Sequence, residues 1–137
     1  MARKPNVGDV IQVALPNGEY AYGRVLRDAA VAFYRVHSKV PGEPPLGSRD
    51  FQFVVGVYDD VLSEWPVVAT DPSRTSDEDW PPSTSVTDPI TKRLKYIYER
   101  GEMRPLKPGE DGVGLEPLAV WDRADLLDRL TRRSISN

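Results

Sequence analysis

The alternation of large and small side chains is clearest near the start of the chain. In residues 10–15 three large aliphatic side chains share one parity, and in residues 20–26 two tyrosines, an arginine and a leucine alternate with smaller residues. A period of two is typical of β-strands. Asn17 and Gly18 lie between the two runs and favour the positive φ angles of a tight reversal. These residues predict an antiparallel hairpin.

Further strand-like runs follow, separated by segments rich in proline and glycine. They lie at residues 30–36, 51–58, 65–69 and 118–121, and a second hairpin is expected over residues 92–106. Pro66 cannot donate to a sheet ladder, so the strand at 65–69 should lie at an edge. Residues 38–50 contain three prolines and two glycines, which predicts a loop. Asp59 and Asp60 follow a strand directly and should begin a turn.

A helix is expected at the C-terminal end of the chain. Asp122 is suited to its N-cap, and Leu126, Leu127 and Leu130 recur at the spacing of one buried helix face. Together the elements predict a β-dominated α+β fold. The expected form is a small antiparallel, SH3-like, partly open barrel or curled sheet of about six to eight strands, with one C-terminal α-helix.

Length and composition favour one domain over residues 1–137, with a core over residues 7–133. Residues 70–90 are acidic, contain four prolines and should run as irregular surface structure. The chain has no cysteine, which excludes disulfides, thiolate nucleophiles and cysteine-bound metals. It also lacks a long apolar run and an apolar N-terminal segment, so a cytoplasmic protein without a membrane span is expected.

Charge is distributed unevenly, although the net charge is only −3. Residues 59–88 carry eight acidic side chains and one basic side chain, whereas residues 1–50 and 89–137 are each slightly basic. An acidic segment of this kind attracts a cationic partner through long-range electrostatics and disfavours nucleic-acid binding. A solvated acidic loop is the alternative explanation of the same charges.

Candidate catalytic and metal-binding residues are scarce. His37 is the only histidine, so a catalytic dyad, a triad or a multi-histidine metal site would depend on it alone. Asp59 and Asp60 are adjacent and would point to opposite faces of a strand, so a turn explains them better than a carboxylate pair. The run 109–114 is rich in glycine but lacks the Lys-Ser/Thr pair of a phosphate loop. We therefore expect no enzymatic activity, no cofactor and no metal.

The aromatic residues should divide between core and surface. Trp121 precedes the expected helix and should lie in the core, and Trp65 is expected in the core or at its rim. Trp80 precedes two prolines and lies among acidic residues, a setting that suits an exposed position at a protein interface. Tyr20 and Tyr22 could lie on either face of the first hairpin.

Several motifs follow one another in a consistent order along residues 5–130. They lie at residues 8–10, 15–18, 20–26, 57–62, 65–67, 80–82, 96–98, 101–105, 114–116 and 119–122. The ordered set resembles the Immunity protein 26 family of bacterial polymorphic-toxin systems. The resemblance implies a small cytosolic protein that binds and neutralises a cognate secreted toxin, usually encoded beside it. The family pattern carries no catalytic motif, and the loop at 38–50 is not part of it.

The resulting hypothesis is a stoichiometric inhibitor that covers or distorts the active site of a toxin. The residues expected to contact the toxin are Asp59, Asp60, Glu64, Asp77, Glu78, Asp79 and Trp80. These residues are chosen because many toxin domains are cationic nucleases. The alternative is an SH3-like binding module that recognises nucleic acid or a proline-rich peptide through Tyr20 and Tyr22. The oligomeric state and the identity of the toxin stay open at this point.

Overall fold

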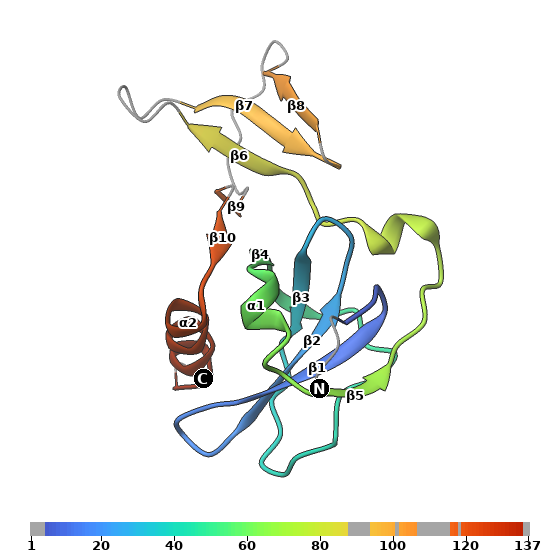
Figure 1. Cartoon of the computed structure of the whole chain (residues 1–137), viewed down its shortest axis with the longest axis vertical. Helices are drawn as coiled ribbons and strands as arrows, with labels where there is room; N and C mark the ends of the chain where they lie inside the picture. The colour runs from blue at the N-terminus through green and yellow to red at the C-terminus, as the bar shows by residue number, and fades with distance from the viewer. Residues whose placement is uncertain (1–4, 88–93, 101, 107–115, 118, 136–137) are drawn as a thin grey trace.

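A computed structural model describes residues 5–87, 94–100, 102–106, 116–117 and 119–135 of the chain (Figure 1). The larger of its two sheets contains, in spatial order, β10 (Val120–Trp121), β4 (Phe51–Val57), β3 (Ala30–Tyr34), β2 (Tyr20–Val25), β1 (Asp9–Ala14) and β5 (Val67–Thr70). The smaller sheet contains β8 (Glu102–Pro105), β7 (Leu94–Glu99), β6 (Thr84–Thr87) and β9 (Glu116–Pro117). The helices are α1 (Asp59–Leu62), the 3-10 helix η1 (Ser76–Asp79) and α2 (Arg123–Ile135).

The predicted fold class is confirmed. The described part of the chain is dominated by strands, α2 is its main helix, and the larger sheet stays open because β10 and β5 lie at opposite ends of its strand order. The strands outnumber the expectation and divide between two sheets. Most neighbours are antiparallel, but β10 pairs with β4 and β6 with β9 in parallel. Each of these short parallel pairs joins segments far apart in the sequence, so local sequence pattern does not predict them.

The first hairpin forms as predicted. β1 pairs antiparallel with β2, and Ala14 lies opposite Tyr20 at the turn end. Gly18 has a φ of 87°, and the Asn17 side-chain oxygen accepts a hydrogen bond of 2.9 Å from the backbone N–H of Glu19. The turn residues therefore hold the register of the two strands.

A tighter turn joins β2 to β3. Its two central residues, Asp28 and Ala29, have φ angles of 63° and 55°, and the N–H of Ala30 donates to the carbonyl of Arg27 at 3.3 Å. Two consecutive positive φ angles define a type I′ turn, in which glycine normally occupies the second position. Ala29 therefore holds a conformation that its Cβ disfavours.

The apolar core lies between one face of the larger sheet and α2. It contains Ile11, Val13, Leu15, Ala21, Val25, Val31, Phe33, Phe53, Val55, Val57, Val61, Leu62, Trp65, Leu126 and Leu130. Gly23 is required on this face, because a Cβ there would come within 2.5 Å of Val31. Trp65 is buried as expected, and Trp121 and Leu127 pack against the same core. The three aliphatic residues that share one parity in residues 10–15 therefore face this core together, and on β2 the smaller Ala21 and Val25 do so rather than the tyrosines.

The C-terminal helix is also confirmed. The Asp122 carboxylate accepts a hydrogen bond of 2.9 Å from the backbone N–H of Asp125, which is the expected N-cap contact. Leu126 and Leu130 are fully buried. On the flank of this stripe, the guanidinium of Arg129 lies 3.9 Å from the ring centroid of Phe53, a cation–π contact that closes the edge of the core.

Two local predictions are corrected. Asp59 and Asp60 begin the one-turn helix α1 rather than a simple turn. The segment 70–90, expected to be irregular, contains η1 and the strand β6. β6 forms because it finds partners in β7 and β9, and tertiary pairing of this kind outweighs a weak local propensity. The glycine-rich run 109–114 lies outside the described residues.

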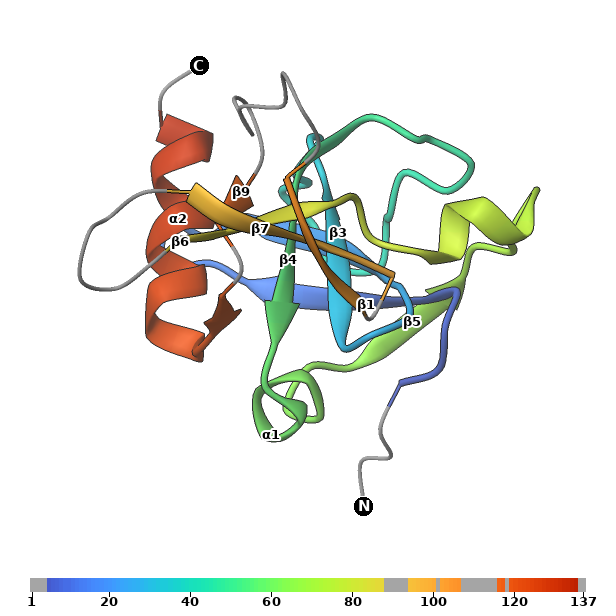
Figure 2. The ribbon, with the colours of Figure 1, turned by 90° about the horizontal axis from the view of Figure 1, so that it is seen from above.

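The smaller sheet lies against one end of the larger sheet. Viewed from above, β6 and β7 cross over β3 and β4 (Figure 2). A hydrogen bond of 2.7 Å from the Tyr98 hydroxyl to the Asp28 carboxylate joins the two sheets. β5, at the far end of the larger sheet, is the edge strand expected from Pro66. No helix of the described chain is both long and apolar enough to span a membrane.

Candidate partner-binding site

The acidic residues nominated from the sequence do not form one surface. Asp59 and Asp60 lie at the start of α1, and Asp77, Glu78 and Asp79 lie in η1. Figures 1 and 2 show α1 and the yellow-green 3-10 helix on different sides of the molecule. The structure therefore divides the acidic stretch into two groups with different surroundings.

The α1 group faces outward. Asp59 and Asp60 are exposed, and Tyr58, directly before them, is 52% exposed. Glu64 is also exposed and pairs with Arg123 at 3.4 Å. An ion pair of this kind between exposed side chains contributes little to stability, so Glu64 stays accessible to a partner.

The η1 group instead surrounds a buried arginine. Arg24 is 1% exposed, and its Nε donates to the backbone carbonyl of Asp71 at 3.0 Å. Its Nη2 donates to Ser73 at 2.8 Å and pairs with the Asp79 carboxylate at 3.2 Å. The segment that follows β5 is thereby tied to the C-terminal end of β2.

A second arginine extends this network. Arg49 pairs with Asp71 at 3.0 Å and with Glu78 at 2.8 Å. The Tyr34 hydroxyl donates to the Asp71 carboxylate at 2.5 Å. We call this network the arginine clamp and define it as Arg24, Tyr34, Arg49, Asp71, Ser73, Glu78 and Asp79. It joins β2 and β3 to the loop before β4 and to the segment 71–79.

The clamp favours the charged form of its carboxylates. Hydrogen bonds from Arg49, and then from the backbone of Arg74, lower the pKa of Glu78 to about 2. Burial alone would raise the pKa of Asp71, but hydrogen bonds from Tyr34, Gly47 and Arg49 lower it overall. A hydrogen bond from Ser73 is the main reason that the pKa of Asp79 is lowered. These groups therefore hold the fold together as anions.

The surroundings of Trp80 differ from the exposed position expected from the sequence. The indole is half-buried, with the guanidinium groups of Arg27 and Arg100 at 5.5 and 5.9 Å from its ring centroids. Arg100 also pairs with Asp77 at 3.0 Å. Of the nominated η1 residues, Asp77 is the most exposed, whereas Glu78 and Asp79 face the clamp.

The face expected for an SH3-like ligand is not free. Tyr22 is fully buried, and its hydroxyl lies 2.7 Å from the Ser38 hydroxyl and accepts a hydrogen bond of 3.1 Å from the N–H of Glu43. Residues 38–50 therefore cover this face of the hairpin. Tyr20 is half-buried beside it. The long proline-rich loop has a structural role that the sequence did not reveal.

His37 is placed for a structural role rather than for catalysis. Its ring lies 3.0 Å from the Gln52 amide and 3.8 Å from the Glu19 carboxylate. Burial lowers the pKa of His37, although Glu19 opposes that change. In the described part of the chain, no three His, Cys, Asp or Glu side chains gather as a metal site would require.

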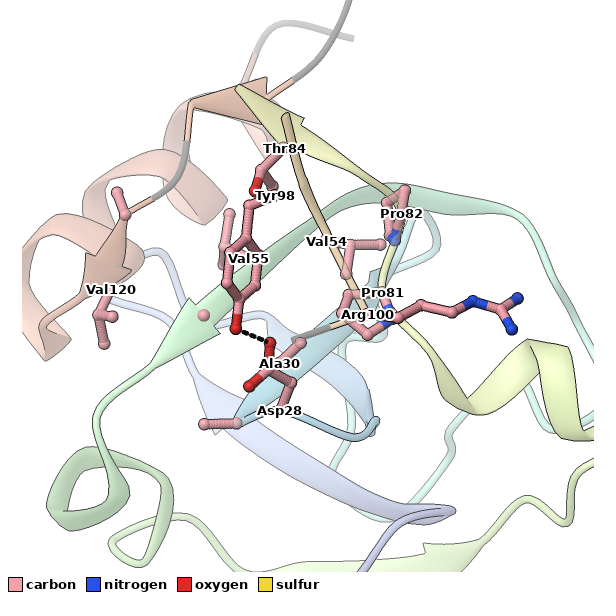
Figure 3. A pocket seen from close by; sticks show the side chains of 13 residues that line it. Asp28, Ala30, Val54, Val55, Pro81, Pro82, Thr84, Tyr98, Arg100 and Val120 are labelled. Carbon is pink, nitrogen blue, oxygen red and sulfur yellow. Dashed lines mark hydrogen bonds between the residues drawn. The ribbon is translucent and has the colours of Figure 1, made fainter. Parts of the chain in front are cut away.

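A cleft between the two sheets was not foreseen from the sequence. It has a volume of about 250 Å³ and is lined on one side by Ala30 and Val55 and on the other by Thr84 and Tyr98 (Figure 3). Its lining is mostly apolar. We call it the inter-sheet cleft. Sequence reasoning missed it because its walls come from separate segments, such as those that contain Ala30 and Thr84, and the packing of the two sheets alone brings them together.

Comparison with known proteins gives one positive result. The model of a family described as Immunity protein 26 matches residues 6–93, a range that includes the whole clamp, α1 and β1 to β6. No curated protein and no solved structure matches the chain significantly.

Proposed function

Because the chain belongs to the Immunity protein 26 family, we propose that it binds a bacterial toxin domain and neutralises it by stoichiometric protein–protein contact. The family match over residues 6–93 is the observation that carries this proposal. Inhibition of this kind needs a complementary surface but no turnover. Immunity proteins in general act by binding, which agrees with the structural role of His37.

The partner is a cognate toxin domain of a polymorphic-toxin system, encoded beside the gene for this chain. The immunity protein acts in the cytoplasm of the producing cell or its kin, where it protects against that toxin. It uses no cofactor. Competition between neighbouring bacteria is the setting in which this protection has value.

The outward acidic group supplies the first contact with the toxin. Asp59 and Asp60 are exposed on α1, with Glu64 close behind them in the chain. Exposed carboxylates raise the association rate with a cationic partner through long-range attraction. Glu78 and Asp79 face the clamp instead, so we assign them to the stability of the fold rather than to contact with the toxin.

Co-expression tests the proposal. The toxin domain encoded by the neighbouring gene should stop growth alone, and growth should return when this chain is co-expressed. Titration calorimetry with an inactivated toxin domain should then give a single saturable stoichiometry. Persistent toxicity in the presence of a soluble, folded partner would refute immunity toward that toxin.

Charge reversal tests the surface. The double variant Asp59→Lys/Asp60→Lys should lower the association rate about tenfold at low salt, with less effect at high salt. Asp77→Lys is the matched control, because Asp77 is exposed in the other acidic group, and it should change the rate by about twofold or less. A larger decrease in the association rate for Asp77→Lys than for the double variant would instead assign the contact surface to η1.

A further inference from the structure

The inter-sheet cleft is bounded on three sides by different parts of the fold. β3 and β4 contribute Ala30, Val54 and Val55, the smaller sheet contributes Tyr98, and β10 contributes Val120 (Figure 3). The Tyr98 ring extends from β7 toward Asp28 across the cleft, and their hydrogen bond holds it there. The cleft is therefore built by the packing of the two sheets rather than by a single loop.

Apolar surface continues out of the cleft. Val120 is 49% exposed on β10, and the next residue, Trp121, accepts a backbone hydrogen bond of 3.4 Å from Tyr58. Tyr58 is exposed and precedes α1. Exposed apolar side chains that are continuous with an apolar cleft are typical of a binding site.

Several acidic side chains of the described residues lie around this surface. Asp28 lies on the rim of the cleft, Asp59 and Asp60 follow Tyr58, and Asp125 lies beside Val120. Asp128, near the same residues, is balanced by Arg132 at 3.1 Å.

Three basic groups of the described residues contact side chains outside the cleft. Arg100 lines the cleft but pairs with Asp77, and Arg27 lies over the Trp80 ring. Arg123, at the start of α2, pairs with Glu64. Among the described residues, Asp28, Asp60 and Asp125 therefore give this surface a negative character that favours a positively charged occupant.

We propose that the inter-sheet cleft receives an aromatic side chain from a positively charged segment of the toxin domain. This inference rests on the proposed function and names the contact that gives it affinity. An aromatic ring suits a mostly apolar cleft of about 250 Å³ and can pack against the Tyr98 ring. Aromatic anchors seated in pockets dominate the binding energy of many interfaces, and the surrounding carboxylates attract the basic residues that flank the anchor.

A second copy of this chain is a poorer occupant. It would bring the same acidic rim against itself, and like charges at an interface oppose association. The experiments below distinguish these occupants.

A small-molecule probe tests the cleft without the toxin. Tryptamine carries an indole ring and an ammonium group, whereas indole-3-acetate carries the same ring and a carboxylate. In ¹H–¹⁵N spectra of the full chain, tryptamine should shift the amides of Ala30, Val55, Thr84 and Tyr98 with saturation, and indole-3-acetate should bind at least about fivefold more weakly. Equal binding of the two probes, or no saturable shift at these amides, would overturn the proposal.

Substitution at Val120 tests the same surface with the toxin domain. Val120→Lys places a cation at the mouth of the cleft and should lower both tryptamine binding and toxin affinity at least about tenfold. Val36→Lys is the matched control, because Val36 is an exposed valine away from the cleft, and it should leave both unchanged. Far-UV circular dichroism of both variants establishes that they fold.

The outcomes separate the two proposals. If wild-type protein binds tryptamine at the cleft but fails to rescue growth, the proposed immunity toward that toxin is refuted. The preference of the cleft for a positively charged aromatic group is then still supported. If rescue succeeds and Val120→Lys rescues equally well with unchanged affinity, the cleft assignment is overturned and immunity stands. A concentration-dependent dimer of the wild type that Val120→Lys abolishes would assign the cleft to a second copy and overturn the toxin contact.

Discussion

The arginine clamp and the inter-sheet cleft use polar residues in opposite ways. In the clamp, the buried guanidinium of Arg24 and the carboxylates of Asp71 and Asp79 all have partners within 3.2 Å. At the cleft, the buried Thr84 hydroxyl has no hydrogen-bond partner among the described residues, and Ala29 holds a positive φ angle. Strained or unsatisfied groups are concentrated at binding sites in many proteins. The contrast is consistent with a stabilising role of the clamp and with the recognition role that we propose for the cleft.

Substitution of Arg24, the central residue of the clamp, should give the largest loss of stability. Arg24→Met leaves Asp79 without its buried cation, and loss of one partner of a buried pair costs about 3–5 kcal/mol. We expect the free energy of unfolding, measured by urea denaturation, to fall by that amount. Arg35→Met is the control, because Arg35 forms an exposed pair with Asp50, and it should cost about 1 kcal/mol or less. Similar losses in the two variants would show that the clamp adds no special stability.

Acid should loosen the clamp. Glu78, Asp71 and Asp79 have lowered pKa values in the folded state, so they stabilise it above their unfolded pKa of about 4. That stabilisation is lost as the pH falls through the folded values. The free energy of unfolding should therefore decrease between about pH 5 and pH 2.

Denaturant titrations at several pH values measure this decrease. Arg49→Met removes the partner that lowers the pKa of Glu78, so the variant should show a shallower pH dependence over the same range. A slope equal to that of the wild type would contradict the assignment of the pH dependence to the clamp.

Removal of the Thr84 hydroxyl should raise the free energy of unfolding rather than lower it. Thr84→Val keeps the shape of the side chain and removes a buried polar atom that lacks a partner. A stabilisation of about 1 kcal/mol is expected. Thr84→Ser keeps the hydroxyl and should not stabilise. Thermal unfolding of the three proteins checks the prediction, and destabilisation by Thr84→Val would mean that the hydroxyl has a partner in solution.

The smallest effect is expected at the turn below the cleft. Glycine adopts the left-handed conformation of residue 29 without strain but adds entropy to the unfolded chain, so Ala29→Gly should stabilise by about 0.5–1 kcal/mol. Ala14→Gly offers a matched control in a strand with ordinary backbone angles, where glycine should destabilise. A loss of stability in Ala29→Gly would show that the turn is not strained.

Local sequence pattern predicted an element correctly wherever the residues that define the element are close together in the sequence. The alternation around Asn17-Gly18 predicted the first hairpin, and the leucine spacing after Asp122 predicted α2. The same reasoning could not place Glu78 and Asp79. In a proline-rich segment, the local sequence around an acidic side chain is the same whether that side chain faces water or a buried arginine. The large side chain of Arg24 was visible on the strand, but its partners lie more than forty residues away.

The sequence by itself determined the β-dominated fold class, the first hairpin, the C-terminal helix and the resemblance to Immunity protein 26. Periodicity and turn residues act over a few positions, so they can be read directly along the chain. Tertiary structure alone decided that one acidic group stabilises the fold while the other faces outward, and that two sheets enclose a cleft. Those features depend on contacts between residues that come together only when distant strands pair, and local sequence pattern does not encode such contacts.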